Sequence, residues 1–170
     1  MSDWLNGLKR LESKVTDNLF VPPSSRWRWF FTTGAHLGDG LLWAVIGLCL
    51  AIWGNAFWRA TVLITGLAVF LATTWSTLIK YTIRRHRPQE LAQFYALKND
   101  RYSFPSGHAT RMAAIATVVG QLVPKLAPAS CGLALFVAAC RVAVGVHYPS
   151  DVLTGLVIGS LSAITTLFLI

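Results

Sequence analysis

Long apolar stretches separated by short polar ones make up most of this chain. A helix needs about 20 apolar residues to cross a bilayer. Four stretches approach or reach that length with at most one charge each, and a fifth is apolar after its first turns. They are residues 40–54 (reaching back to residue 34 across Asp39), 60–79, 106–123, 126–146 and 152–170. The pattern predicts an all-α, multi-pass transmembrane helical bundle of about five spans.

The first 33 residues follow a different pattern. Apolar positions recur at helical spacing, and most charged residues fall between them. These positions are Trp4, Leu8, Leu11, Val15 and Leu19. The pattern predicts an amphipathic interfacial helix on the membrane surface, and Arg26-Trp27-Arg28-Trp29 resembles an interfacial belt. A solvated helix packed on its own protein is the alternative. Since no signal-peptide core precedes residue 34, we divide the chain into an interfacial segment, 1–33, and a transmembrane domain, 34–170.

Composition supports a membrane protein and raises a second question. The chain is 54% hydrophobic and 13% charged, whereas soluble domains average about 25% charged residues. Its net charge is nevertheless +8. Such a surplus serves nucleic acid, anionic lipid head groups or phosphate substrates. Cys49, Cys131 and Cys140 lie in apolar segments without metal-ligand spacing, so we interpret them as buried hydrophobic residues.

The basic residues gather at one face of the predicted bundle. With five spans, the N-terminal segment, the loop 80–105 and the turn near residue 147 share a face. Of the 15 Lys and Arg residues, only Arg59 and Lys125 fall on the other face. Besides three candidate site cations, the first face carries Lys9, Arg10, Lys14, Arg26, Arg28, Arg84, Arg85, Lys98, Arg101 and Arg111. The positive-inside rule then predicts that this face is cytoplasmic, in a protein of the cell (inner) membrane. We expect no nucleic-acid partner.

Two polar motifs occupy the middle of that face. The first, KYTIRRHRP at residues 80–88, would place Lys80, Arg84 and Arg87 on one side if the helix continued. A topogenic stretch that only stops transfer is the alternative. The second motif, Pro-Ser-Gly-His, opens the apolar segment 106–123. Its Ser is a candidate helix cap, its Gly admits close backbone approach, and the N–H groups of the first turn favour an anion.

The third motif is CRVAVGVHYPSDV, residues 140–152. Arg141 falls within a predicted span, where an ionisable side chain indicates function. His147 and Asp151 are four residues apart, and Pro149 suits the first turn of the last helix. The Asp151 carboxylate is therefore expected to accept the Nδ1–H of His147, which fixes the tautomer and leaves Nε2 nucleophilic.

Together the motifs supply cations, helix-start amides and two histidines, an inventory suited to phosphoryl transfer. They resemble the signature of the type 2 phosphatidic acid phosphatase (PAP2) superfamily: K-x6-R-P, P-S-G-H and S-R-x5-H-x3-D. Here they read Lys80 to Pro88, Pro105 to His108 and Arg141 to Asp151, with Cys140 where the family usually has serine. The run HLGDG, residues 36–40, is similar to small bacterial members.

The resemblance implies a role for each residue. His147 would attack phosphorus and form a phosphohistidine, with Asp151 orienting it. His108 would protonate the leaving oxygen and then take a proton from water. The phosphoryl oxygens would be held by Lys80, Arg87, Arg141, the Ser106 hydroxyl and the Ser106 and Gly107 amides. We expect no metal or other cofactor, because three cations and a helix N-terminus already neutralise a phosphate.

The implied substrate is a membrane lipid phosphate: phosphatidic acid, phosphatidylglycerophosphate, or a polyprenyl phosphate or diphosphate. Arg84, Arg85, Lys98 and Arg101 suit a second phosphate, although a topogenic role explains them equally, and the loop 89–104 would shape the entrance. Family members that act on polyprenyl diphosphates commonly face outward, which opposes the cytoplasmic prediction. Two alternatives belong to other classes: a non-enzymatic membrane protein that binds anionic lipids, and a vanadium haloperoxidase relative, which the apolar spans disfavour. Gly155 and Gly159 fit either helix packing within the bundle or an oligomer contact, and the oligomeric state stays open.

Overall fold

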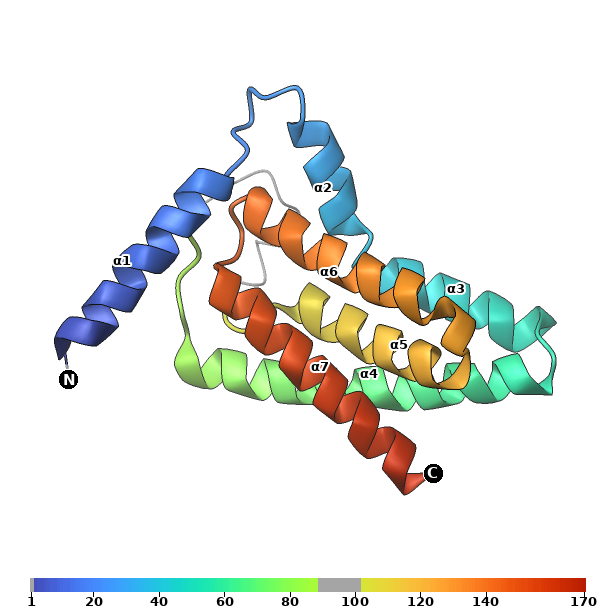
Figure 1. Ribbon diagram of the computed structural model, residues 1–170. Coiled ribbons are helices and arrows are strands. Elements are labelled where there is room, and N and C mark those ends of the chain that lie inside the picture. Colours follow the sequence, from blue (N-terminus) through green and yellow to red (C-terminus); the bar gives the residue numbers. More distant parts are fainter. Residues whose placement is uncertain (1, 89–101) are drawn as a thin grey trace.

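The computed structural model describes residues 2–88 and 102–170, and in that part the secondary structure is entirely helical (Figure 1). The elements are α1 (Ser2–Leu19), α2 (Arg28–His36), α3 (Gly40–Trp53), α4 (Ala56–Ile83), α5 (Gly107–Leu122), the 3-10 helix η2 (Pro124–Leu126), α6 (Ala127–Ala143) and α7 (Pro149–Leu169). The predicted all-α bundle is therefore confirmed.

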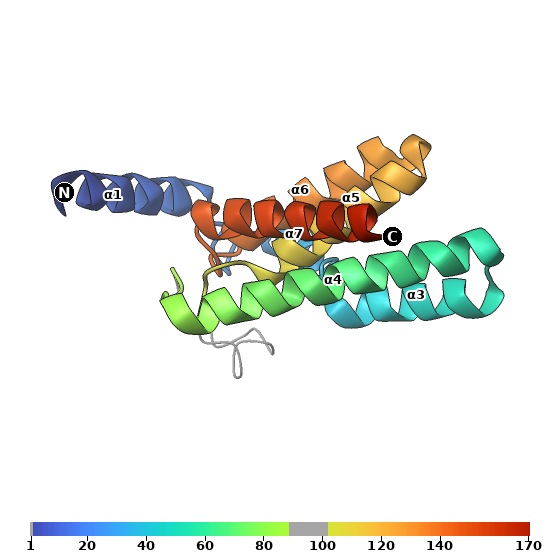
Figure 2. The same ribbon diagram turned by 90° about the horizontal axis from the view of Figure 1, so that it is seen from below.

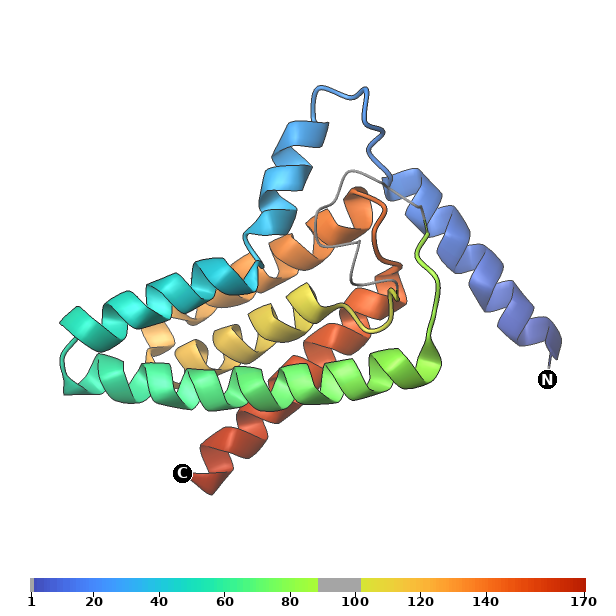
Figure 3. The ribbon, with the colours of Figure 1, turned by 180° about the vertical axis from the view of Figure 1, so that it is seen from behind.

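Helix α5 forms the centre of the bundle. It packs against α4, α6 and α7, and the views from front and back both show it between α4 and α6 (Figures 1 and 3). Small and apolar residues make this packing possible, since Ala109, Met112, Ala114 and Val118 are at most 1% exposed. The outer helices instead direct large apolar side chains outward: Leu41, Phe70 and Phe168 are 79%, 73% and 87% exposed. This apolar exterior requires a lipid environment.

Three helices, α4, α7 and η2 continued by α6, are long and apolar enough to cross a membrane. A fourth span results if α2 and α3, which meet at a bend of 50°, are taken as one. The fifth expected span is α5. With 16 residues it is shorter than the others, and its place in the core explains its buried surface. The sequence count of about five thus corresponds to three or four outer spans around one central helix.

Helix α4 ends earlier than the basic motif suggested. Its N-terminus is capped by Asn55, whose Oδ1 accepts the Trp58 N–H at 3.1 Å. Its C-terminus is fixed by Arg84, which adopts a left-handed conformation with φ of 52°. The helix does not continue to Arg87, so the condition for placing Lys80, Arg84 and Arg87 on one helix side is not met. Lys80 lies in the last turn of α4, and Arg87 follows in the irregular segment.

Helix α1 lies beside the bundle and contacts α6 and α7 (Figures 1 and 2). Its Thr16 side chain is buried, while Leu11, Val15 and Leu19 on another face are 60%, 38% and 53% exposed. The predicted amphipathic helix is thus present, with an apolar stripe that the described residues leave exposed.

Close approach of α5 and α7 depends on two glycines of α7. A Cβ atom at Gly159 would lie 2.1 Å from the Thr110 carbonyl oxygen, and one at Gly155 would lie 2.7 Å from the Ser106 carbonyl oxygen. The spacing of these glycines therefore serves packing within the bundle. This close packing also sets the distance between the start of α5 and the start of α7.

We expect Gly159→Ala to lower the unfolding temperature in detergent, because the added methyl group overpacks the α5–α7 contact at a cost of about 1–3 kcal/mol. Gly66→Ala is the matched control, because a Cβ atom there meets no atom of the described residues within 4 Å. It should be neutral or stabilising, since alanine is favoured in helices by about 0.5–1 kcal/mol. Equal unfolding temperatures for both variants would contradict this account of the packing.

Candidate active site

Four chain segments bring the sequence-predicted residues to one end of the bundle. The C-terminal ends of α4 and α6 and the N-terminal ends of α5 and α7 meet there, next to the C-terminal end of α1 (Figure 1). Lys80 comes from α4, Arg141 from α6 and Asp151 from α7, while His147 occupies the short connection between α6 and α7. All four are buried, between 0% and 8% exposed.

His147 is surrounded by cations. Its Nε2 atom lies 3.3 Å from Arg87 Nη1 and 3.5 Å from Arg141 Nη2. Arg87 also donates to the Val146 carbonyl oxygen at 2.8 Å, which ties it to the same connection. Burial and the positive charges of Arg141, Arg87 and Lys80 hold the pKa of His147 well below its usual value. The imidazole is therefore neutral at physiological pH, as a nucleophile must be.

Asp151 lies beside His147 as predicted, but the two side chains are not in hydrogen-bond contact. Asp151 Oδ2 is 3.5 Å from His147 Nδ1 and accepts the Tyr148 N–H at 2.8 Å. Its Oδ1 accepts from Arg85 Nη1 at 2.9 Å. At this distance the expected Nδ1–H hydrogen bond is not formed, and the carboxylate instead caps the start of α7.

Ser106 differs from the predicted cap. It occupies the N-cap position of α5, but its hydroxyl makes no capping hydrogen bond. The residue is 0% exposed, and its Oγ has no hydrogen-bond partner among the described residues. Its backbone N–H, expected to bind phosphate, instead donates to the Asp151 carbonyl oxygen at 3.0 Å. What remains at the helix start is a buried hydroxyl and the Gly107 amide, one of the first-turn N–H groups that lack an intrahelical partner.

Arg85, next to the motif, is a site residue that sequence reasoning assigned differently. Its Nη2 binds Glu12 Oε2 at 2.6 Å and its Nη1 binds Ser150 Oγ at 2.7 Å, in addition to Asp151. The guanidinium also lies 3.9 Å from the centre of the Tyr148 ring. Arg85 is therefore committed to protein groups rather than to a second phosphate. Of the other cations suggested for that role, Lys98 and Arg101 lie outside the described residues.

Glu12 connects α1 to this network, which no sequence pattern indicated. It accepts hydrogen bonds from the Ser150 backbone N–H at 3.1 Å and from the Ser150 hydroxyl. Burial opposes ionisation of Glu12, but the hydrogen bonds from Arg85 and Ser150 outweigh it and lower its pKa. The charge of Glu12 thus stabilises α1 docking above the ordinary pKa of glutamate, and this contribution is lost as the pH falls through the lowered value.

His108, the predicted acid, lies in the first turn of α5 with 16% of its side chain exposed. Its Nε2 atom lies 2.7 Å from Asp39 Oδ1. Asp39 belongs to the run HLGDG, for which the sequence suggested no role. Cys140 is buried as predicted and packs in an apolar cluster with Ala35, Val144 and Val146. The same interpretation is wrong for Cys49 and Cys131, which are exposed.

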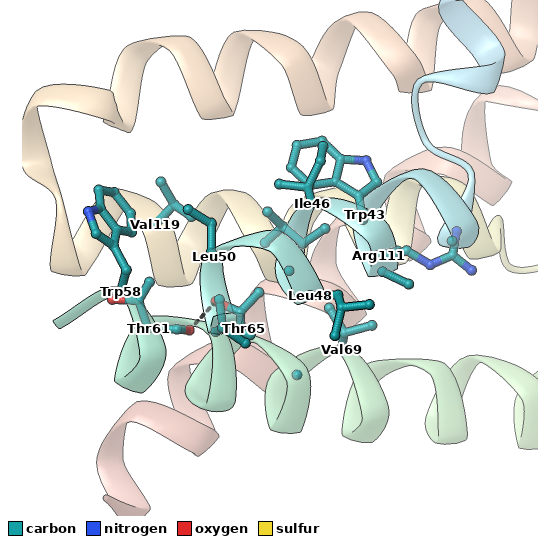
Figure 4. Close-up of a pocket in the computed structure, with 17 residues that line it drawn as sticks. Trp43, Ile46, Leu48, Leu50, Trp58, Thr61, Thr65, Val69, Arg111 and Val119 are labelled. Carbon is teal, nitrogen blue, oxygen red and sulfur yellow. Dashed lines mark hydrogen bonds between the residues drawn. The ribbon is translucent and has the colours of Figure 1, made fainter. Parts of the chain in front are cut away.

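An apolar cavity of about 510 Å³ lies between α3, α4 and α5 (Figure 4). Arg111, one turn after His108, lies at one end of it, and Trp58 lies at the other. Among the described residues, no group of three or more His, Cys, Asp and Glu side chains is arranged to hold a metal ion.

The geometry thus defines a membrane-embedded helical protein with a buried cationic site around a neutral histidine. A sequence profile of the PAP2 superfamily matches residues 59–169. The chain is 35% identical over 130 residues to a decaprenylphosphoryl-5-phosphoribose phosphatase of Mycobacterium tuberculosis, covering 74% of this chain and 71% of that protein. It is 31% identical over 121 residues to a lipid A 1-phosphatase of Rhizobium etli, covering 67% of this chain and 49% of that protein.

Solved structures agree with the fold. Aquifex aeolicus LpxE has a TM-score of 0.75 at 26% identity, covering 91% of this chain and 93% of that one. A transmembrane PAP2 type phosphatidylglycerolphosphate phosphatase from Bacillus subtilis has a TM-score of 0.77 at 19% identity, covering 96% and 86%. The chain therefore belongs to the PAP2 superfamily. It is a multi-pass membrane lipid phosphatase.

Proposed function

We propose that this phosphatase hydrolyses a phosphomonoester of a polyprenyl-type lipid through a phosphohistidine on His147. The observation that carries the mechanism is the position of His147 Nε2, a neutral imidazole nitrogen within 3.5 Å of two guanidinium groups. Cations at this position hold phosphoryl oxygens while Nε2 attacks phosphorus, and they neutralise the charge that develops in the transition state.

The remaining site residues complete the reaction. Asp151 stabilises the imidazolium character that His147 gains on phosphorylation, and Arg85 holds Asp151 in place. Lys80, Arg87 and Arg141 bind the phosphoryl oxygens, together with the Gly107 amide. The Ser106 hydroxyl supports this assignment, because it is buried and lacks a partner among the described residues, as expected of a ligand-binding donor.

His108 transfers the protons. As His147 Nε2 bonds to phosphorus, the P–O bond to the leaving group breaks and His108 protonates the leaving oxygen. In the second step a water molecule gives a proton to His108, the water oxygen bonds to phosphorus, and the P–N bond to His147 breaks. Phosphate and the unmodified enzyme result.

Two observations favour a monoester with a long hydrocarbon chain. Arg85 is committed to Glu12 and Asp151, so it is not an additional cation for a second phosphate. The apolar cavity between α3 and α4 runs from Arg111, one turn from His108, and offers space for part of a hydrocarbon chain. The similarity to the Mycobacterium tuberculosis decaprenylphosphoryl-5-phosphoribose phosphatase supports a polyprenyl-linked substrate.

We also propose that the protein lies in the inner membrane and that its active-site end faces the cytoplasm. Arg59 and Lys125 are the described cations at the opposite end, whereas the remaining described cations lie toward the active-site end. The positive-inside rule supports the orientation. In the same arrangement α1 lies along the membrane surface, with the exposed stripe of Leu11, Val15 and Leu19 in the interface.

We expect His147→Ala to abolish phosphate release from detergent-solubilised decaprenyl phosphate, because the reaction loses its nucleophile. His86→Ala is the matched control, since His86 is exposed and outside the site. Both variants should purify with unchanged unfolding temperatures, and a chelator should leave the activity of the unaltered protein intact. Substantial turnover by His147→Ala, or dependence on a divalent ion, would disprove the mechanism.

A substrate panel tests the monoester assignment. We expect kcat/KM for decaprenyl phosphate to exceed that for decaprenyl diphosphate and for dioleoyl phosphatidic acid, with inhibition of all three reactions by vanadate. Phosphate release from each lipid in the same detergent is the measurement. A preference for the diphosphate would show that a second phosphate has its own binding group, and a preference for phosphatidic acid would reject the polyprenyl class.

Orientation is tested at the C-terminus, which lies at the end of the bundle opposite the active site (Figure 1). A protease-cleavable tag placed after Ile170 should be removed from intact spheroplasts by added protease. A tag that is cleaved only after the membrane is permeabilised would place the active site outside.

A further inference from the structure

The connection between α2 and α3 places an acidic side chain on the predicted acid of the reaction. Asp39 Oδ1 lies 2.7 Å from His108 Nε2, and its Oδ2 lies 2.9 Å from His36 Nδ1. Asp39 and His108 are 69 positions apart in the sequence, so the tertiary fold brings them into contact. The reaction described above gives Asp39 no role.

Neighbouring contacts hold the connection in this position. Arg111 Nη1 donates to the Gly38 carbonyl oxygen at 2.6 Å, and Trp43 Nε1 donates to the Leu37 carbonyl oxygen at 2.7 Å. Gly38 packs directly on the histidine, because an added Cβ atom would lie 3.0 Å from His108 Cδ2. The bend of 50° between α2 and α3 is therefore fixed against α5, and Asp39 is presented to the imidazole.

The charges around His108 show what Asp39 contributes. Arg141 of α6 and Arg111 of α5 both act on the imidazole as positive charges, and Asp39 acts on it as the hydrogen-bonded negative charge. His147, the other titratable group that interacts with His108 in the site, is neutral. Cations that bind phosphate disfavour a protonated histidine beside them, whereas a hydrogen-bonded carboxylate favours it.

We propose that Asp39 is the positioning residue for the acid–base step, holding the His108 ring in the orientation and protonation state that the leaving group requires. This inference rests on the proposed function. Since Nε2–H is donated to Asp39, Nδ1 is the nitrogen that exchanges protons with the substrate. The Nδ1 proton passes to the leaving oxygen as the P–O bond breaks, and Nδ1 receives a proton from water when the P–N bond is hydrolysed.

The run HLGDG thereby acquires a function. Gly38 permits contact with the His108 ring, and Asp39 supplies the charge. A merely structural Asp39 would lower kcat/KM for all substrates alike. A residue acting through the acid lowers kcat/KM, which reports the phosphorylation step, only for substrates whose leaving group needs a proton. Leaving-group dependence therefore separates the two roles.

The test compares Asp39→Asn with the unaltered protein on two phosphomonoesters. Decyl phosphate needs protonation of its leaving oxygen, and 4-nitrophenyl phosphate does not. We expect kcat/KM for decyl phosphate to fall about 10- to 100-fold, the usual effect of removing a residue that orients a reacting group. For 4-nitrophenyl phosphate, kcat/KM should be nearly unchanged, because its phosphorylation step needs no acid. Asp39→Glu should restore most of the activity on decyl phosphate.

The pH profile gives a second readout. Loss of the negative charge makes protonated His108 less stable, so the alkaline limb of kcat for decyl phosphate should move to lower pH in Asp39→Asn. Asp17→Asn, which removes an exposed acidic group from α1, is the matched control and should leave the profile in place. Equal losses on both substrates, no loss on either, or an unmoved alkaline limb would each overturn the proposal. A loss of activity in Asp39→Asn would not by itself contradict the assignment of His147 as the nucleophile.

Discussion

Positive charge concentrated around a buried, neutral imidazole is the constraint on which the rest of this structure depends. Lys80 and Arg141 are 8% and 3% exposed, and Arg87 reaches the same histidine from the segment after α4. Cations are costly to bring together away from water. A phosphoryl group would offset this cost by supplying negative charge, and in the proposed mechanism the same arrangement keeps His147 ready to attack it.

Helix packing serves this constraint directly. The glycines of α7 allow α5 to approach so closely that the Ser106 N–H donates to the Asp151 carbonyl oxygen. That single backbone contact joins the helix start carrying His108 to the helix start that orients His147. From the other side, Glu12 of α1 holds Arg85, and Arg85 holds Asp151. Helix α1 and the Asp151 carboxylate therefore share one chain of charged contacts, which links the docking of α1 to the carboxylate beside His147.

Much of the fold and the residue inventory could be predicted from sequence, for physical reasons. Apolar segments of bilayer length identify α4, α6 and α7, and a shorter one identifies α3, because lipid exposure demands apolar side chains on every outward face. The buried Arg141 and the spacing of His147 and Asp151 identify the site, because charge within a span is rarely without function. The family resemblance is confirmed by the profile match.

Other features lay beyond sequence reasoning. The ion pairs of Glu12 and Arg85, and of Asp39 and His108, join residues 73 and 69 positions apart, and no local periodicity encodes such contacts. The left-handed Arg84 that ends α4 was not predicted either, because a non-glycine residue rarely adopts this conformation and its residue type gives no sign of it. Ser106 was predicted to cap α5 through its hydroxyl, because the cap position is visible in sequence while the direction of the side chain is not.

The most direct test of the account is to trap the covalent intermediate. Enzyme mixed with decaprenyl phosphate labelled with ³²P should be quenched within milliseconds in alkali and digested, and the labelled peptide identified. The account predicts a label that is stable in alkali, labile in acid and attached to His147. A label on any other residue, or no labelled protein at substrate concentrations that support turnover, would contradict it.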